Sequence, residues 1–211
     1  MSATDPTTPE PRRFSIRLPR PLWIGLITGV LIVMATGLQI ILPIWRQQQA
    51  IREIQRLGGR IVIENGGPEW LRARVGDEHM KYFDRVVRAD LTVKSVDDST
   101  LRHVAALDNL QALWLGNSRI SDDGLVYLRG MTQLEQLWLG NTRVTDAGLV
   151  QLKPLRRLRE LSLGNTDVSD VGIAHIQGLR ALQRLSLGNT RVTEVGVAEL
   201  QRALPGLSIE R

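Results

Sequence analysis

The feature that most limits how this chain can fold is a 24-residue period in its C-terminal half. Four near-identical units read LWLGNSRISDDGL from Leu113, LWLGNTRVTDAGL from Leu137, LSLGNTDVSDVGI from Leu161 and LSLGNTRVTEVGV from Leu185. A weaker copy, ADLTVKSVDDSTL, begins at Ala89. A fixed period of about 20–50 residues indicates stacked units, none of which can bury its apolar face alone. We therefore expect a solenoid in which successive turns share one core.

Each unit changes its periodicity along its length. Leu113 and Leu115 flank an outward position, as in a strand with one buried face, and Gly116 ends that stretch. Further apolar residues then recur every third position, which suits an α- or 3₁₀-helical return: Leu125, Leu128, Met131 and Leu134. A pair such as Ser121-Asp122 offers a capping oxygen and a negative charge to the helix start. The unit predicts strand, turn, helix and turn, with the strands in a parallel sheet.

The pattern LxxLxLxxTxVxDxGLxxLxxL resembles the leucine-rich repeat family, in its short bacterial and cysteine-containing-like subclass. The resemblance covers residues 86–209. The ladder position, which usually holds Asn, Cys or Thr in that family, carries Lys94 in the first copy and then Ser118, Thr142, Thr166 and Thr190. The resemblance implies an α/β solenoid with parallel strands on a concave face and short helices on a convex face. It also implies that the concave face binds other macromolecules without catalysis of its own.

A second feature is the uncharged segment at residues 22–45, LWIGLITGVLIVMATGLQIILPIW. About 20 apolar residues suffice for a helix to cross a hydrocarbon core of about 30 Å. Trp23 and Trp45 flank the segment, and indole rings favour the membrane–water boundary. The segment is longer than the apolar core of a cleaved signal peptide, and no small-residue cleavage pattern follows it. We expect a retained signal anchor that precedes the repeats as a transmembrane helix.

These features divide the chain into four parts. They are a disordered N-terminal tail at 1–21, the transmembrane helix at 22–45, a juxtamembrane helix and N-terminal cap at 46–85, and the repeat domain at 86–211. In the third part, RQQQAIREIQRL at 46–57 has a helical apolar face and RIVIE at 60–64 alternates like a strand. We expect this part to cover the open end of the solenoid core.

The sequence constrains which side of the membrane the repeats occupy less than it constrains the insertion of the segment. Four arginines precede the segment and four follow it closely, so the positive-inside bias is nearly balanced. A signal anchor favours the tail inside and the repeats exported, which we expect to mean a bacterial inner membrane. A cytosolic adaptor is the alternative.

Composition removes several function classes. The chain has no cysteine and only three widely separated histidines, and these patterns match no thiolate or metallohydrolase motif. Residues 46–211 interleave 23 basic residues with 20 acidic ones, whereas nucleic-acid modules concentrate basic residues on one stripe. We expect no enzyme activity, no cofactor or metal, and no nucleic-acid partner.

The candidate binding residues occupy the outward strand positions. Between the paired leucines of the four units stand Trp114, Trp138, Ser162 and Ser186, and before the first leucines of the last three units stand Gln136, Glu160 and Arg184. Exposed tryptophan is enriched in binding hot spots, so these seven residues are our predicted ligand-binding set on the concave face. The alternative is that a cap residue, Trp70 or Tyr82, folds over the two indoles.

Two repeated polar features have a structural interpretation. The Gly-Asn pairs, such as Gly116-Asn117, recur once per unit, which favours turn geometry over a phosphate-binding loop. The acidic row Asp122, Asp146, Asp170 and Glu194 could suit calcium, but helix-start chemistry accounts for it.

The sequence thus predicts a membrane-anchored, non-enzymatic module that binds an unidentified protein partner through Trp114 and Trp138. A receptor for glycan or cell-envelope polysaccharide is a second hypothesis, because aromatic faces also stack on sugars. A structural envelope spacer, which needs no binding patch, is the third.

Overall fold

The computed structural model describes residues 20–80 and 83–211, and the chain forms two compact units, residues 1–41 and 42–211. Helix α1, Arg20–Arg56, is continuous across the boundary between the units and contains Pro43. The helices predicted at 22–45 and 46–57 are therefore one helix. The predicted disordered tail lies outside the described residues, except for its last two positions, which belong to α1.

Helix α1 contains the one segment of the described chain that is long and apolar enough to cross a membrane, Val30–Arg56, judged by length and composition alone. Its most apolar stretch is not buried: Val33 is 70% exposed and Met34 is 67% exposed. Exposed apolar side chains of this kind are unfavourable in water.

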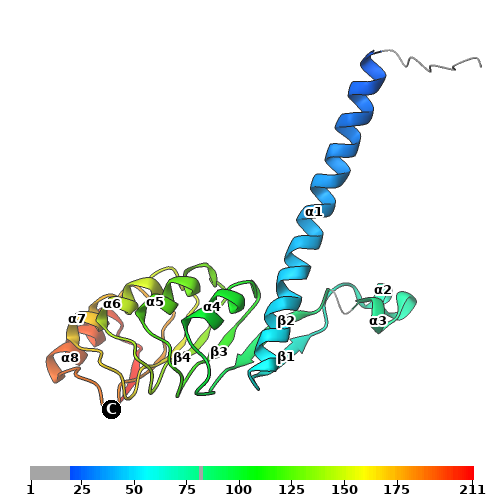
Figure 1. The fold of residues 1–211 in the computed structure, drawn as a ribbon. Coiled ribbons are helices and arrows are strands. Elements are labelled where there is room, and N and C mark those ends of the chain that lie inside the picture. Colours follow the sequence, from blue (N-terminus) through cyan, green and yellow to red (C-terminus); the bar gives the residue numbers. More distant parts are fainter. Residues whose placement is uncertain (1–19, 81–82) are drawn as a thin grey trace, which may run out of the picture. The chain divides into compact units, whose positions relative to one another are not determined.

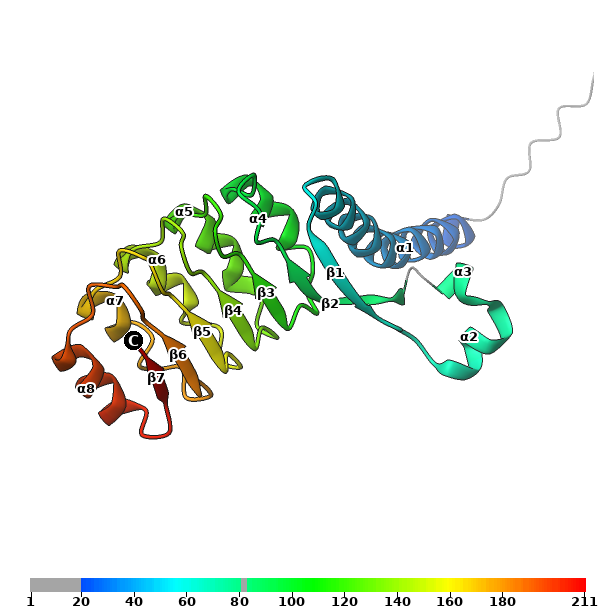
Figure 2. The ribbon, with the colours of Figure 1, turned by 90° about the horizontal axis from the view of Figure 1, so that it is seen from below.

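The second unit is a solenoid of strand–helix turns (Figures 1 and 2). Among the described residues, a seven-stranded sheet runs in sequence order from β1, Arg60–Glu64, to β7. Its repeat strands are β2 Arg85–Asp90, β3 Ala112–Trp114, β4 Gln136–Trp138, β5 Glu160–Ser162, β6 Arg184–Ser186 and β7 Ser208–Glu210. The returns are α4 Asp98–Val104, α5 Asp122–Leu125, η2 Val126–Gly130, α6 Asp146–Leu149, η3 Val150–Leu152, α7 Asp170–Ala174 and α8 Glu194–Ala203.

The repeat strands β2 to β7 are parallel and in register with the sequence period. Leu113 pairs with Leu137, which pairs with Leu161, so each step along the sheet advances the chain by 24 residues. Strands lie along one side of the solenoid and helices α4 to α8 along the other (Figure 2). The leucines of strands and helices meet in one continuous core; Leu115, Leu128 and their equivalents are fully buried. The predicted α/β solenoid with a parallel sheet is confirmed.

The turn after each of the strands β3 to β6 depends on an asparagine in the left-handed region. Asn117, Asn141, Asn165 and Asn189 have φ between 56° and 59°. Asparagine tolerates this conformation better than other non-glycine residues. The side chains also bond between turns: Asn141 Nδ2 donates to Asn117 Oδ1 at 2.6 Å, and Asn189 Nδ2 to Asn165 Oδ1 at 3.0 Å. The structural interpretation of the Gly-Asn pairs is confirmed.

The acidic row lies in the first turns of α5 to α8, as predicted, and its aspartates have a second role that the sequence did not show. Asp122, Asp146 and Asp170 of the row, and Asp98 of the first copy, each accept two hydrogen bonds from the next turn, from a backbone N–H at 2.7–2.8 Å and from the hydroxyl of the same residue at 2.5–2.6 Å. Glu194 pairs instead with Arg211. We call these four pairs the aspartate clamps: Asp98–Ser121, Asp122–Thr145, Asp146–Ser169 and Asp170–Thr193. Their main role is to join successive turns, because both donors lie one turn further along the chain.

The clamps also change the predicted capping. Thr145, Ser169 and Thr193 still accept a bond from their own helix at 3.3–3.4 Å, but Ser121 makes no side-chain capping bond. In the last clamp, the hydroxyl and backbone N–H of Thr193 lower the pKa of Asp170, because both bonds favour the ionised carboxylate.

A glycine lies behind each clamp because there is no room for a side chain. A Cβ atom built on Gly148 would lie 2.4 Å from Asp122 Oδ1, and one on Gly172 would lie 2.3 Å from Asp146 Oδ1. Contacts of that length essentially never occur for real Cβ atoms, so any larger residue at these glycines would displace the carboxylate from its clamp.

The first end of the core is covered by the end of α1 and a hairpin. Ala50 and Ile54 are fully buried in the solenoid core, as the apolar face of the juxtamembrane segment predicts. Strand β1, Arg60–Glu64, pairs antiparallel with β2 and occupies the residues predicted for a strand. The hairpin connection contains α2, Glu69–Val75, and α3, Asp77–Met80.

One arginine ties this connection to the sheet. Arg72 donates to Asp77 Oδ1 at 3.0 Å, to the carbonyl of Gly66 at 3.0 Å and to the carboxylate of Asp84, which directly precedes β2. These bonds to Asp77 and Asp84 raise the pKa of Arg72, because both carboxylates stabilise the guanidinium charge.

Candidate binding surface on the strand face

The outward strand positions lie on the surface because side chains alternate along a strand. Leu137 and Leu139 are fully buried, whereas Trp138 between them is 46% exposed. Leu113 and Leu115 are likewise buried, and Trp114 between them is half-buried. The two indoles therefore point away from the core, as predicted.

The two tryptophans contact each other across neighbouring strands. Their ring centroids are 5.7 Å apart and the rings are tilted by 47°, within the range in which aromatic pairs attract. Trp114 Nε1 is buried without a hydrogen-bond partner among the residues that the structure describes. Trp138 is thus the more exposed of the two indoles, and Trp114 packs against it.

The predicted lid over these rings involves Trp70 and Tyr82. Trp70 is 69% exposed, so it is not packed down on another surface. Tyr82 lies outside the described residues.

The other predicted row is a bonded ladder across three strands. Gln136 Nε2 donates to Glu160 Oε1 at 3.1 Å, and Arg184 Nη2 donates to the same oxygen. An ion pair this exposed contributes under about 1 kcal/mol to stability. Its effect is geometric: it holds the carboxylate and the guanidinium beside the hydroxyls of the adjacent row.

The strand face carries a hollow of about 250 Å³ between these rows. Its lining residues are Trp138, Glu160, Leu161, Ser162, Arg184, Leu185, Ser186 and Glu210. Five of the seven predicted site residues lie together here, while Trp114 and Gln136 lie beside the hollow and contact its lining.

Sequence reasoning missed three lining residues. Leu161 and Leu185 belong to the core, and only their edges reach the hollow. Glu210 pairs in register with Ser186, so one further 24-residue step beyond Ser186 would have found it.

The hollow combines an indole face, two hydroxyls, an ion pair and one further carboxylate. These groups can stack, donate and accept hydrogen bonds, and pair with charge, which are the properties of a binding surface. In the described part of the chain, residues 20–80 and 83–211, no group of three or more histidine or acidic side chains is placed to hold a metal ion.

Comparison with known proteins gives a limited result. No model of a known protein family matches the sequence, and no curated protein matches it. Among solved structures, the chain is similar to an internalin from Listeria monocytogenes, with 25% identity over 52% of this chain and a TM-score of 0.46. It is also similar to internalin C2 from the same species, with 29% identity over 56% of this chain and a TM-score of 0.43.

A third similar structure is the leucine-rich repeat ectodomain of the receptor kinase SOBIR1 from Arabidopsis thaliana, with 19% identity over 78% of this chain and 90% of that one, and a TM-score of 0.48. The chain spans 30% of the first internalin and about half, 51%, of the second. The solenoid assignment rests on the strand register and the shared core described above.

Proposed function

We propose that this protein is a membrane-anchored leucine-rich repeat protein of the short 24-residue type, and that its strand face binds a protein partner without catalysis. The observation that carries the proposal is the hollow beside Trp138, in which an exposed indole, hydroxyls and charged groups converge. Tryptophan and arginine are the residues most enriched in binding hot spots.

The proposed contact residues are the predicted set. Trp138 supplies the apolar anchor, and Trp114 and Gln136 support the lining from the adjacent strand positions. Ser162 and Ser186 offer hydroxyls, and Glu160 with Arg184 offers a fixed ion pair. Specificity would come from these polar groups, because an unmatched partner leaves them desolvated and unpaired.

The test is site-specific photo-crosslinking in intact cells. A photoreactive residue at Ser162 should yield a defined adduct with one protein, and the additional change Trp138→Ala should reduce that adduct strongly. Val171→Ala is the matched control, because Val171 is also exposed but lies on α7, on the helix side. Its adduct should equal that of the unaltered chain. An adduct that survives Trp138→Ala refutes the proposed role of Trp138 in partner binding.

A glycan receptor is the second candidate, favoured by the exposed indole face of Trp138 beside two serine hydroxyls. Retention on cell-envelope polysaccharide that is lost in Trp138→Ala, without any protein adduct, would support it. A structural spacer would show neither effect.

The anchoring role of α1 is proposed from its length, its apolar composition and its exposed apolar side chains. The chain should stay in the membrane fraction after alkaline extraction. We propose that the repeats are on the exported side of a bacterial inner membrane. Protease added to cells with an opened outer membrane should then digest them, and protection until the inner membrane is broken would indicate the cytosolic adaptor instead.

A further inference from the structure

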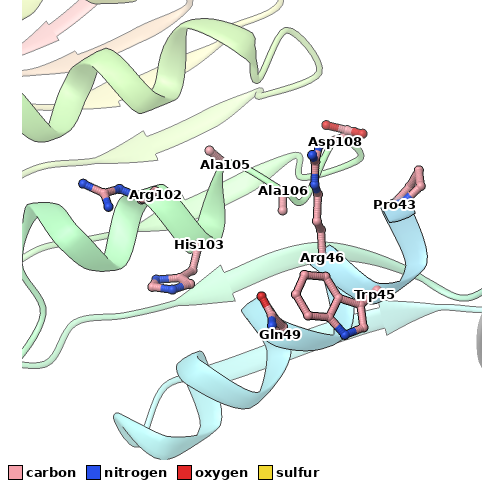
Figure 3. Close-up of a pocket in the computed structure, with 9 residues that line it drawn as sticks. All are labelled: Pro43, Trp45, Arg46, Gln49, Arg102, His103, Ala105, Ala106 and Asp108. Atoms are coloured by element: carbon pink, nitrogen blue, oxygen red, sulfur yellow. The ribbon is translucent and has the colours of Figure 1, made fainter. Parts of the chain in front are cut away.

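A second recess lies where α1 passes the first repeat, wholly within residues 42–211. It has a volume of about 430 Å³ and is formed by Pro43–Gln49 of α1 and by the segment from Arg102 to Asp108, which includes the end of α4. Figure 3 shows Trp45 and Arg46 on one wall and Arg102 and His103 on the other. We call this recess the juxtamembrane cleft.

Both walls of the cleft are fixed to the same core. On the α1 side, Ala50 and Ile54 are fully buried, and Gln47 Nε2 donates to the carbonyl of Asp84 at 2.7 Å. On the α4 side, Leu101 and Val104 are fully buried. Both walls of the cleft are therefore fixed in place by packing against the solenoid core.

One of the two arginines is oriented by the next repeat. Arg102 Nη2 donates to the hydroxyl of Tyr127 at 3.3 Å, and its guanidinium carbon lies 5.8 Å from the centre of the Tyr127 ring. One N–H group is used in this way, and four of the five remain for a ligand. Both Arg46 and Arg102 are exposed, so an anion in the cleft could reach their guanidinium groups.

The charges of the cleft favour an anion. Arg46 and Arg102 bring two positive charges, and Asp108 brings one negative charge; the Arg46 guanidinium points toward Asp108 in Figure 3. His103 adds an imidazole that can donate a hydrogen bond in either neutral tautomer or as the cation. Guanidinium groups match the oxygens of a phosphate in geometry as well as in charge.

The position along α1 selects the source of that phosphate. Trp45 is 54% exposed and directly follows the apolar stretch, where an indole favours the level of lipid headgroups. Leu42, three residues earlier in the same helix, is 36% exposed and offers an apolar surface for an acyl chain. A lipid can satisfy both features together, because its phosphate and its tails are covalently joined.

We propose that the juxtamembrane cleft between Pro43–Gln49 and Arg102–Asp108 binds the phosphate headgroup of an anionic phospholipid. This inference rests on the proposed role of α1 as a membrane anchor. The bound lipid would fasten the first repeat to the membrane surface, beside the point where the chain leaves the bilayer.

The experiment measures which lipid stays with the full-length chain. The protein is reconstituted into nanodiscs of equal phosphatidylglycerol and phosphatidylcholine and extracted with mild detergent, and the retained lipids are quantified by mass spectrometry. Two arginines at an anionic surface, offset by one aspartate, should enrich phosphatidylglycerol by about fivefold. Arg46→Gln with Arg102→Gln should abolish the enrichment.

Two further variants separate binding from folding. Arg156→Gln with Arg157→Gln removes the same charge from exposed positions of a distant turn and should keep the full enrichment. Asp108→Asn removes the one negative charge of the cleft and should raise the enrichment, a gain that misfolding does not produce.

Other results of the lipid-retention experiment would refute the proposed lipid site. Three results would each overturn the inference. The first is equal retention of both lipids by the unaltered chain, and the second is unchanged enrichment in the double-glutamine variant. The third is displacement of the lipids by excess inorganic phosphate with no preference between the two. Alkaline extraction of the same preparations tests the anchor separately. A chain that leaves the membrane refutes the anchor, whereas a chain that stays without selecting a lipid refutes the cleft alone.

Discussion

The aspartate clamps predict a strong energetic coupling between two residues that lie 26 positions apart, Asp122 and Gly148. In Gly148→Ala, the new methyl group would sit 2.4 Å from Asp122 Oδ1 and 2.9 Å from Leu125 Cδ1. The leucine tip can rotate away, but the carboxylate can move only by giving up its bonds to Thr145. Gly148→Ala therefore breaks the Asp122–Thr145 clamp although neither Asp122 nor Thr145 is changed.

The size of the effect follows from the two bonds that are lost. Asp122 accepts from the backbone N–H of Thr145 at 2.8 Å and from its hydroxyl at 2.6 Å. Hydrogen bonds to charged groups contribute roughly 1.5–3 kcal/mol each when well buried, and this site is half-exposed. We expect each single change, Gly148→Ala and Asp122→Ala, to lower the free energy of unfolding by about 2 kcal/mol.

The double variant distinguishes a shared mechanism from two separate ones. With the carboxylate gone, the methyl group has room, so the pair should also lose about 2 kcal/mol rather than about 4 kcal/mol. Urea-induced unfolding of the detergent-solubilised chain, followed by tryptophan fluorescence, gives the three values. Gly130→Ala is the control, since a Cβ atom there meets nothing within 4 Å. Additive losses would refute the reasoning.

The other predictions concern acid stability, turn conformation and the division between surface and core. Because bonds from Thr193 lower the pKa of Asp170 below its ordinary value of 3.8, their stabilisation is present above that pH and is lost as the pH falls through the lowered pKa. Unfolding midpoints measured against pH should therefore fall less steeply in acid for Asp170→Asn, and identical slopes would contradict this. Asn165→Ala should cost about 1 kcal/mol at φ 56°, whereas Asn165→Gly should cost less in the same urea assay. Trp138→Ala should cost about 1 kcal/mol or less, because the ring is half-exposed, while Leu137→Ala should cost about 2–5 kcal/mol. Equal losses at these two neighbouring positions would mean that the strand register is wrong.

The repeat fold could be predicted because the pattern within one unit also determines which residues of the next unit it contacts. A residue such as Leu137 repeats the surroundings of Leu113, so one unit's periodicity describes all of them. The outward direction of Trp138 followed from the same alternation. The strand RIVIE was predictable because its own pattern is strong, and it occupies residues 60–64 as expected.

What could not be predicted depends on distances between turns. A sequence shows that Asp122 begins a helix, but its acceptor role toward Thr145 appears only when the turns are stacked. The sharing of one Glu160 oxygen by Gln136 and Arg184 has the same origin. The juxtamembrane cleft was missed because its walls, Pro43–Gln49 and Arg102–Asp108, belong to segments with no common pattern.

The aspartate clamps also bear on how such a chain can lengthen. Each clamp has its acceptor in one turn and its donors in the next, and the excluded side chain is replaced by glycine in that second turn. A tandem duplication of 24 residues anywhere among the central units would carry one acceptor, one donor pair and one glycine. Every new junction between units would then contain a complete aspartate clamp. The gene could therefore gain or lose whole units by unequal recombination without passing through an unstable protein.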